Sequence, residues 1–417
     1  MKTMNRIFKI FWLLVFLCAV MIALTESAVV ISTPKDQARQ LTRKLKFDYI
    51  AWTLKAVEIK AAGGAIGVSQ RLTPTRQHQV VVRYFDLVEQ LESLQGQIQQ
   101  VYSDPSVENP SEVAAEKLAL QEEMQTVLAK LDPIVEAILQ QQVTATLIQM
   151  GIPRLGEVLP PVLFHTSATP RSLIMSPRER IEQDVSISLM ADMTLEEMSQ
   201  LEEKVEEKTG QSALVVGTGG IGVYPTMIMR TSSLDWVINT IAHEWTHNYL
   251  TLRVLGLNYE TNAELRIMNE TTASIAGNEI GEAVIQKYYP ELAASTGQSG
   301  KKFAPIKDDA FNFNAEMHLT RVRVDRLLEE GRIDEAEQYM EQRRQVFVDH
   351  GYLIRKLNQA YFAFYGAYAD SPVSAAGEDP VGEAVRELRT QSSTLAEFLR
   401  EMGRMNSYED LLKAVSD

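Results

Sequence analysis

The chain has 417 residues, of which 45% are hydrophobic, and it carries a formal net charge of −14 at pH 7. This composition excludes collagen-like and wholly disordered proteins, and the length allows two or three domains with sizeable cores. The acidic charge argues against a general nucleic-acid binder, which needs concentrated lysine and arginine. The single cysteine, Cys18, excludes an intramolecular disulfide and a cysteine-rich metal cluster, so a metal site would need histidine and carboxylate ligands.

An apolar, uncharged run from Ile10 to Leu24 follows a basic N-terminus. Such a run is typical of a signal peptide or of an N-terminal membrane anchor. Because Glu26 interrupts the possible cleavage site, we favour an uncleaved single-pass anchor within residues 1–30, with secretion after signal cleavage as the alternative. Basic residues also follow the run and weaken the charge asymmetry, but we expect the C-terminal bulk to be exported.

Residues 31–155 are expected to form a helical N-terminal domain. Apolar residues recur at every third or fourth position from Val81 to Ile98 and again from Val113 to Leu131. Residues 104–110, which contain two prolines, separate these stripes and predict an antiparallel helical hairpin. A partner-binding coiled coil is the alternative, but the shortness of the stripes favours a hairpin that packs within its own domain.

Residues 156–256 change to short alternating runs, which predict β-strands. The runs are VLFHTS, SLIMS, DVSISLM, SALVV and VYPTMIM, with a charged helix expected from Thr194 to Thr209. We therefore expect a small mixed sheet with one helix on it. Beyond Leu234 the chain again has a helical pattern, with a loop at 370–382, and residues 257–417 are expected to form a helical C-terminal subdomain. This order of elements predicts an α+β fold.

The stretch GTGGIG, Gly217 to Gly222, matches the GxGxxG pattern of dinucleotide-binding proteins. That chemistry needs a helix directly after the glycines, because the helix N-terminus holds the pyrophosphate. Here Pro225 and a β-type pattern follow instead. We therefore interpret the stretch as a glycine turn between strands and keep nucleotide binding as a weaker alternative.

The stretch NTIAHEWTHNYL contains His243, Glu244 and His247 in the pattern HExxH. In a helix that ends near Gly256, His243 and His247 project from one face, one turn apart, as two imidazoles that share a zinc ion must do. Glu244 is adjacent and could take a proton from a metal-bound water. Two structural histidines are the alternative, but the chain has only six histidines, which makes a chance HExxH rare.

A catalytic zinc needs a third protein ligand and an open fourth position. Thr261 and Glu264 predict a capping box that starts the next helix and occupies Glu264. Glu270 lies on that helix in a stripe of small residues, which allows another helix to come close. The other residues of the stripe are Ser274, Gly277 and Gly281. Glu270 is therefore the predicted third ligand.

The HExxH motif and the sequence NETTA, Asn269 to Ala273, resemble the gluzincin metallopeptidases, most closely their aminopeptidase branch. The resemblance implies a zincin-like fold, with a sheet before the HExxH helix and a helical part after it. It also implies hydrolysis of peptide bonds by a Zn²⁺ ion held by His243, His247 and Glu270. The segment 343–368 is similar to putative bacterial aminopeptidases.

The chain departs from this family at two points. Ser274 stands where thermolysin-like members have an aspartate that orients a histidine ligand, and no Gly-x-Met-Glu-Asn element precedes the helix. The choice between endopeptidase and aminopeptidase action therefore stays open. The family also implies a tyrosine or histidine that stabilises the oxyanion. The candidates are His318, Tyr361, Tyr365 and Tyr368, of which we favour Tyr368.

The expected function is zinc-dependent hydrolysis of a peptide or protein substrate by a membrane-anchored metallopeptidase, with Glu244 as the general base. The alternative is a catalytically inactive zincin-fold protein that serves as a membrane-anchored binding or scaffold protein. The substrate, the oligomeric state and the role of the N-terminal helices stay open.

Overall fold

The structure, a computed structural model, describes residues 33–103, 108–152, 158–292, 311–352, 354–365 and 380–416. The expected anchor at Ile10 to Leu24, Tyr368 and most of the loop at 370–382 lie outside these ranges. Every helix within the described ranges is too short or too polar to cross a bilayer. The fold is α+β and mainly helical, as expected.

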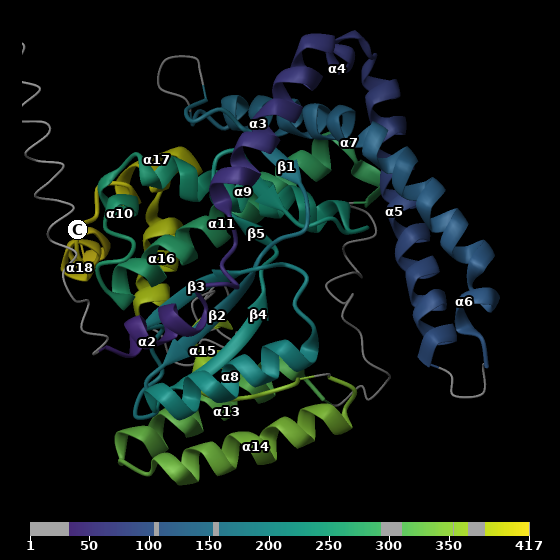
Figure 1. The fold of residues 1–417 in the computed structure, drawn as a ribbon. Coiled ribbons are helices and arrows are strands. Elements are labelled where there is room, and N and C mark those ends of the chain that lie inside the picture. Colours follow the sequence, from purple (N-terminus) through teal and green to yellow (C-terminus); the bar gives the residue numbers. More distant parts are fainter. Residues whose placement is uncertain are drawn as a thin grey trace, which may run out of the picture.

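The first part of the described chain is helical. Its helices are α2 (Pro34–Leu41), α3 (Tyr49–Ile66), α4 (Val68–Arg71), α5 (Pro74–Ser103), α6 (Pro110–Val113) and α7 (Ala115–Gln149). Figure 1 shows α5 and α7 side by side, joined through α6. The stripes predicted from sequence bury Val81 and Val88 of α5 and Leu128 and Leu139 of α7 in one core. The predicted antiparallel hairpin is therefore confirmed.

The five predicted strands are present, and a sixth, β5, lies within the stretch Gly217 to Gly222 that we expected to be a glycine turn. The six strands form two sheets of three strands each instead of one mixed sheet. The strands are β1 (Phe164–Thr166), β2 (Arg171–Ser176), β3 (Val185–Leu189), β4 (Ser212–Gly217), β5 (Gly220–Ile221) and β6 (Thr226–Ile228). The sheet β3-β2-β4 is antiparallel. The sheet β1-β6-β5 is mixed, because β1 is parallel to β6 and β5 is antiparallel to it.

Helices cover both faces of the antiparallel sheet. The charged helix α8 (Leu195–Thr209) buries Leu201 and Val205 against Leu173 of β2. The next residue of β2, Ile174, points to the opposite face and packs with Ala360 of α15 (Gln359–Tyr365), because successive side chains of a strand alternate. The strand residues are apolar on both faces for this reason.

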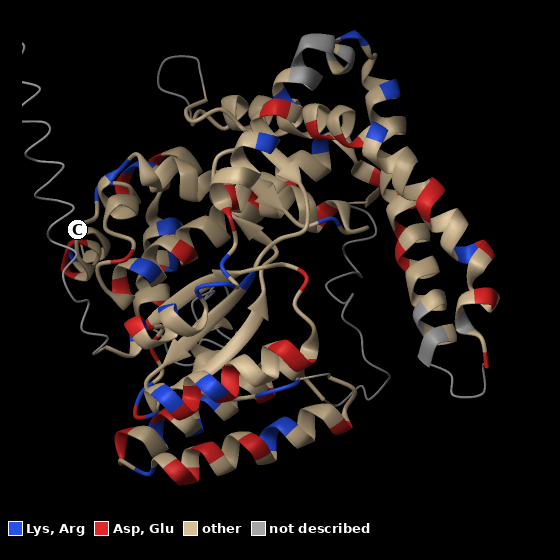
Figure 2. Ribbon diagram, viewed as in Figure 1, with Lys and Arg blue, Asp and Glu red and all other residues tan. Residues whose placement is uncertain are grey.

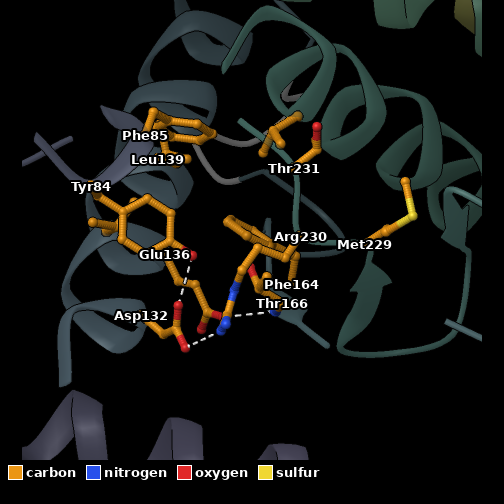
Figure 3. A pocket seen from close by; sticks show the side chains of 12 residues that line it. Tyr84, Phe85, Asp132, Glu136, Leu139, Phe164, Thr166, Met229, Arg230 and Thr231 are labelled. Atoms are coloured by element: carbon orange, nitrogen blue, oxygen red, sulfur yellow. Dashed lines mark hydrogen bonds and ion pairs between the residues drawn. The ribbon is translucent and has the colours of Figure 1, made fainter. Parts of the chain in front are cut away.

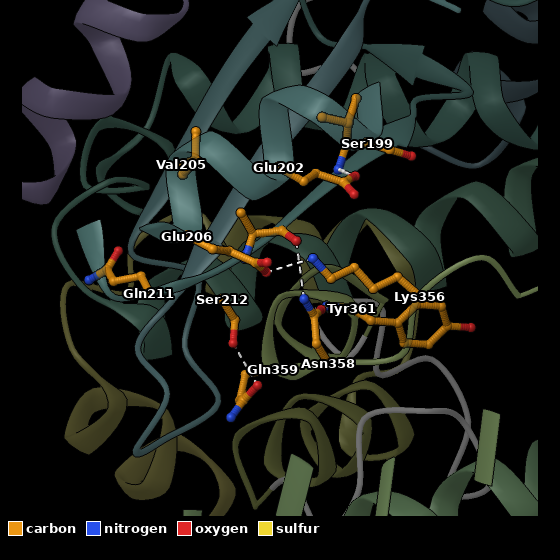
Figure 4. A network of polar contacts seen from close by, with 12 residues as sticks. Ser199, Glu202, Val205, Glu206, Gln211, Ser212, Lys356, Asn358, Gln359 and Tyr361 are labelled. Carbon is orange, nitrogen blue, oxygen red and sulfur yellow. Dashed lines mark hydrogen bonds and ion pairs between the residues drawn. The ribbon is translucent and has the colours of Figure 1, made fainter. Parts of the chain in front are cut away.

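A polar network ties the chain just before α15 to α8 and β4 (Figure 4). The carboxylate of Glu202, which is almost fully buried, accepts hydrogen bonds from Arg355 at 2.5 and 2.7 Å and from the backbone N–H of Val215 at 2.6 Å. The side chain of Asn358 donates to the carbonyl of Ala213 at 3.1 Å. These charge-assisted bonds satisfy a buried carboxylate and fix α15 on the sheet.

The remaining C-terminal helices are α13 (Phe313–Glu329), α14 (Ile333–Asp349), α16 (Pro380–Gln391), α17 (Leu395–Met402) and α18 (Tyr408–Ser416). Acidic and basic residues are mixed along α8, α13 and α14, whereas the strands carry few charges (Figure 2). Phe347 of α14 and Phe362 of α15 share a small core with α13. In contrast, α16, α17 and α18 contribute to the main core.

The helices that carry the HExxH motif and NETTA pack closely against each other. They are α9 (Leu234–Thr251) and α11 (Ala263–Tyr288), with the short α10 (Val254–Leu257) between them. A Cβ added at Gly277 would lie 3.1 Å from both the carbonyl oxygen of Asn239 and the Cβ of His243. One added at Gly281 would overlap the side chain of Asn239. The predicted stripe of small residues is therefore the contact face of α11.

Two helix ends differ from the prediction. The N-cap of α11 is Asn262, whose Oδ1 accepts the backbone N–H of Leu265 at 2.8 Å, so the capping box expected at Thr261 is wrong. An asparagine is as good an N-cap as a threonine, and the sequence alone did not separate the two neighbours. Glu264 is exposed in the first turn of α11.

The second difference concerns the end of α9, whose C-cap is Leu252 rather than Gly256. Gly256 lies in α10, where an added Cβ would be 2.2 Å from the carbonyl carbon of Leu250. The glycine is therefore needed for the close turn of the chain after α9.

The close contact of α9 and α11 can be tested by a pair of substitutions. Gly277→Leu should lower the free energy of unfolding by about 1–3 kcal/mol or more, because the new side chain has no room. Gly96→Leu on α5 is the control, since nothing lies within 4 Å of its Cβ position. It should be neutral or stabilising by up to about 1 kcal/mol through helix propensity. Equal destabilisation in urea-unfolding experiments would contradict the close contact.

Candidate metal centre

Three side chains predicted as ligands meet between α9 and α11. The Nε2 atoms of His243 and His247 are 3.0 Å apart, and Oε2 of Glu270 lies 3.6 Å from the first and 3.4 Å from the second. A tetrahedral zinc ion with bonds of about 2.0–2.1 Å would separate its ligand atoms by about 3.3 Å. The three atoms are therefore spaced as the ligands of one metal ion, and this group could hold such an ion.

The carboxylate of Glu270 supports this assignment. Its side chain is buried, and Oε2 makes no hydrogen bond among the described residues although both imidazoles are near. An unsatisfied buried carboxylate oxygen is costly in an apolar interior. A cation between Oε2 and the two Nε2 atoms would remove that cost, so the donor set fits a metal ion.

Asn269 orients one of the histidines. Its Oδ1 accepts a hydrogen bond from Nδ1 of His247 at 2.8 Å, and Asn269 is almost fully buried. With the proton on Nδ1, Nε2 is left with its lone pair for a metal. The residue before Glu270 therefore orients His247.

Tyr259 is a second residue that the sequence analysis missed. It lies in the segment between α10 and α11, and its hydroxyl donates a hydrogen bond of 2.5 Å to Oε1 of Glu270. Its ring lies edge-on to that of His247, with 6.2 Å between the ring centroids. No periodicity signals such a contact, because Tyr259 is outside any helix or strand.

Glu244 lies beside the three ligands, buried against the glycine strand β5. A Cβ added at Gly220 would be 2.7 Å from Oε1 of Glu244, and one added at Gly222 would be 3.4 Å from Oε2 and 3.2 Å from the Cβ of His247. The glycines of GTGGIG thus let β5 approach the motif helix. Strand β6 follows instead of a helix, so the dinucleotide-binding alternative lacks the element that it needs.

The charges of the site shift its pKa values. Burial raises the pKa of Glu244, and the positive charges of His243 and His247 oppose this shift only in part. Burial alone would lower the pKa of His247, but the negative charge of Glu270 outweighs it and raises the pKa to about 9. Without a metal, His247 therefore holds a proton at neutral pH, which an incoming cation must displace.

Tyr49, at the start of α3, connects the N-terminal helices to strand β3. Burial raises the pKa of Tyr49 at the start of α3, the hydrogen bond of 2.8 Å from its hydroxyl to Oγ of Ser188 opposes this, and the charge of Glu244 raises the pKa further. The sequence analysis left the role of these helices open. The structure bonds one of their tyrosines, Tyr49, to strand β3.

The expected oxyanion donors are not brought to the metal residues in the described part of the chain. Tyr361 and Tyr365 lie on α15, where their rings contact each other at 4.5 Å between centroids. His318 lies on α13, which packs against α14. The described contacts of these three residues include none with the metal residues. Tyr368 lies outside the described residues, so its expected role stays a prediction.

A second cluster of charged residues lines a small pocket between the hairpin and β1 (Figure 3). Asp132 accepts hydrogen bonds from the hydroxyl of Tyr84 at 2.7 Å and from Arg230 at 2.6 Å. Glu136 accepts from the backbone N–H of Thr166 at 2.7 Å. Because both carboxylates are satisfied by protein donors, this cluster joins the hairpin to the sheet rather than offering a metal site.

Comparisons with family models, with curated proteins and with solved structures find no match to this chain. The functional assignment therefore depends on the residues and geometry of the site itself.

The ligand assignment predicts how variants hold metal. The purified protein should retain about one zinc ion per chain, whereas His247→Ala and Glu270→Ala should lose it, because two ligands form a poor site. Glu264→Ala is the control, since this carboxylate is exposed on the same helix. Zinc content by atomic spectroscopy, with folding checked by circular dichroism, gives the comparison. Full zinc content in either ligand variant would refute the assignment.

Proposed function

We propose that the protein is a zinc-dependent metallopeptidase with a zincin-like fold, which hydrolyses peptide bonds. The observation that carries this proposal is the spacing of 3.0–3.6 Å among the ligand atoms of His243, His247 and Glu270. Two imidazoles and one carboxylate are a donor set of catalytic zinc sites, which keep a fourth position for water or substrate. Glu244 is adjacent to this set and is not part of it.

The bound metal would supply a water of lowered pKa, from about 16 to about 7, and would polarise the scissile carbonyl. Glu244 would be the general base, which takes a proton from the attacking water and then delivers it to the leaving amine. Gly220 and Gly222 keep side chains of β5 out of the space around Glu244.

Asn269 has a supporting role in this proposal. By accepting the Nδ1 proton of His247, it keeps Nε2 free for the metal and fixes the plane of the ring. The departure from the family at Ser274 stays as it is, because this bond concerns His247 alone. The oxyanion donor, and the choice between endopeptidase and aminopeptidase action, are left open.

The alternative is a catalytically inactive, membrane-anchored binding or scaffold protein with the same fold. The intact set of three ligands together with Glu244 favours the enzyme, because a scaffold has no need for a free carboxylate beside the metal ligands.

We further propose that the apolar run from Ile10 to Leu24 anchors the protein in a membrane and that the catalytic part is exported. The support for this is the sequence alone, namely the uncharged run and the poor cleavage site at Glu26.

Glu244→Gln separates the enzyme from the scaffold. Glutamine keeps the size of the side chain but cannot accept the proton of the water, so peptide hydrolysis should fall by a factor on the order of 10²–10⁴ while zinc is retained. A mixed peptide library with free and blocked N-termini identifies a substrate first and shows whether a free amine is needed. Glu264→Gln, an exposed change on α11, should leave the rate unchanged. Equal rates for Glu244→Gln and wild type would exclude this mechanism.

The anchor predicts where the protein is found and how it begins. Expressed protein should remain in the membrane fraction after a salt wash and should have the intact mass of a chain that starts at or near Met1. A soluble exported form that starts near Ala28 would show that Ile10 to Leu24 is a cleaved signal peptide.

A further inference from the structure

The two oxygens of the Glu270 carboxylate have different surroundings. Oε1 accepts the hydrogen bond of 2.5 Å from the hydroxyl of Tyr259. Oε2 has no hydrogen-bond donor among the described residues and faces Nε2 of His243 and His247 at 3.6 and 3.4 Å. One oxygen is thus occupied by a protein donor, and the other is directed at the position between the imidazoles.

The ring of Tyr259 is held on two sides. The guanidinium group of Arg266 lies 5.8 Å from the ring centroid, and the ring of His247 lies edge-on at 6.2 Å. Arg266 is almost fully buried and donates to the carbonyl of Gln183 at 2.7 Å, which fixes its position. The partly buried ring of Tyr259 therefore lies between Arg266 and His247.

The hydroxyl of Tyr259 is not needed to fold its own segment. The backbone N–H of Tyr259 donates to the carbonyl of Gly256 at 3.3 Å, and that of Thr261 donates to the carbonyl of Asn258 at 3.0 Å. Asn262 caps the following helix. Because these bonds hold the segment, the bond from the hydroxyl to Glu270 has its effect on the carboxylate.

We propose that Tyr259 is a positioning residue that makes Glu270 a one-oxygen ligand. This inference rests on the proposed metal site. With Oε1 held by the hydroxyl and Oε2 directed at the imidazoles, the carboxylate favours binding a metal ion through Oε2 alone, so that the protein supplies three donor atoms and a fourth position stays open. Without the hydroxyl, the carboxylate is free to rotate and to offer both oxygens or neither.

Tyr259→Phe removes only the hydroxyl and keeps the ring against Arg266 and His247. Its zinc dissociation constant, measured by competition with a chelator, should rise by about 10–100-fold, the usual effect of losing a partner that orients a ligand. The visible absorption of the cobalt-substituted protein should also change, because it reports the coordination number and geometry of the metal. A purely structural role would not change this spectrum.

The matched control is Tyr84→Phe, which removes a hydroxyl that donates to another buried carboxylate, Asp132, at 2.7 Å. This variant should be less stable, with the zinc affinity and cobalt spectrum of the wild type. If Tyr259→Phe does not fold, Arg266→Lys loosens the ring while it keeps the hydroxyl. That variant should weaken zinc binding in the same direction and by a smaller factor, and an unchanged affinity would overturn the proposal.

The outcomes separate this inference from the proposed function. Wild-type affinity and spectrum in Tyr259→Phe would overturn the role of Tyr259 and leave the peptidase proposal intact. A wild-type protein that binds zinc but cleaves no peptide would refute the peptidase proposal, while the affinity of Tyr259→Phe would still decide the role of the tyrosine. A wild-type protein that binds no metal would overturn both.

Discussion

The close contact between α9 and α11 is the constraint on which the rest of the site depends. Two imidazoles on one helix cannot recruit a carboxylate from another unless the helix backbones come very near. Gly277 and Gly281 permit this, because neither carries a Cβ that would strike Asn239 or His243. The two helices pass in opposite directions, so the end of the contact at Gly281 meets Asn239 and the other end brings Glu270 to His247.

A second close contact, on another side of α9, completes this arrangement. Gly220 of strand β5 and Gly222 just after it lie against Glu244 and the Cβ of His247. Glycines thus allow the backbones of two segments, one at β5 and one in α11, to come close to α9. This leaves its charged residues little freedom to rotate, and preorganised groups of this kind are what metal chemistry and proton transfer require.

The sequence predicted the parts of this site that helical periodicity controls. The face shared by His243 and His247, and the stripe that contains Glu270, follow from 3.6 residues per turn. Asn269 and Tyr259 could not be predicted in the same way. Asn269 is adjacent to a predicted ligand, but its partner is decided by how the two helices cross, and Tyr259 comes from a segment with no regular pattern.

Alternation also predicted the strands but not which of them pair. The runs at β1 and β6 are short, and their parallel pairing joins segments about sixty residues apart, which no local pattern reveals. The N-cap of α11 was misplaced by one residue because Thr261 and Asn262 are both good N-caps. The tyrosines of α15 were proposed for the site by resemblance, yet Tyr361 packs against the cores beside the antiparallel sheet, and the exposed Tyr365 contacts its ring.

Oε2 of Glu270, which has no hydrogen-bond partner among the described residues, connects metal binding to the stability of the folded chain. The ligands come from two helices and assemble only in the native chain, so a metal that binds them favours the native state by mass action. Free zinc at one hundred times its dissociation constant would add about 2.7 kcal/mol to the free energy of unfolding. A shortage of zinc would then have two effects. The proposed site would lack its metal, and a larger fraction of the chain would be unfolded and open to degradation.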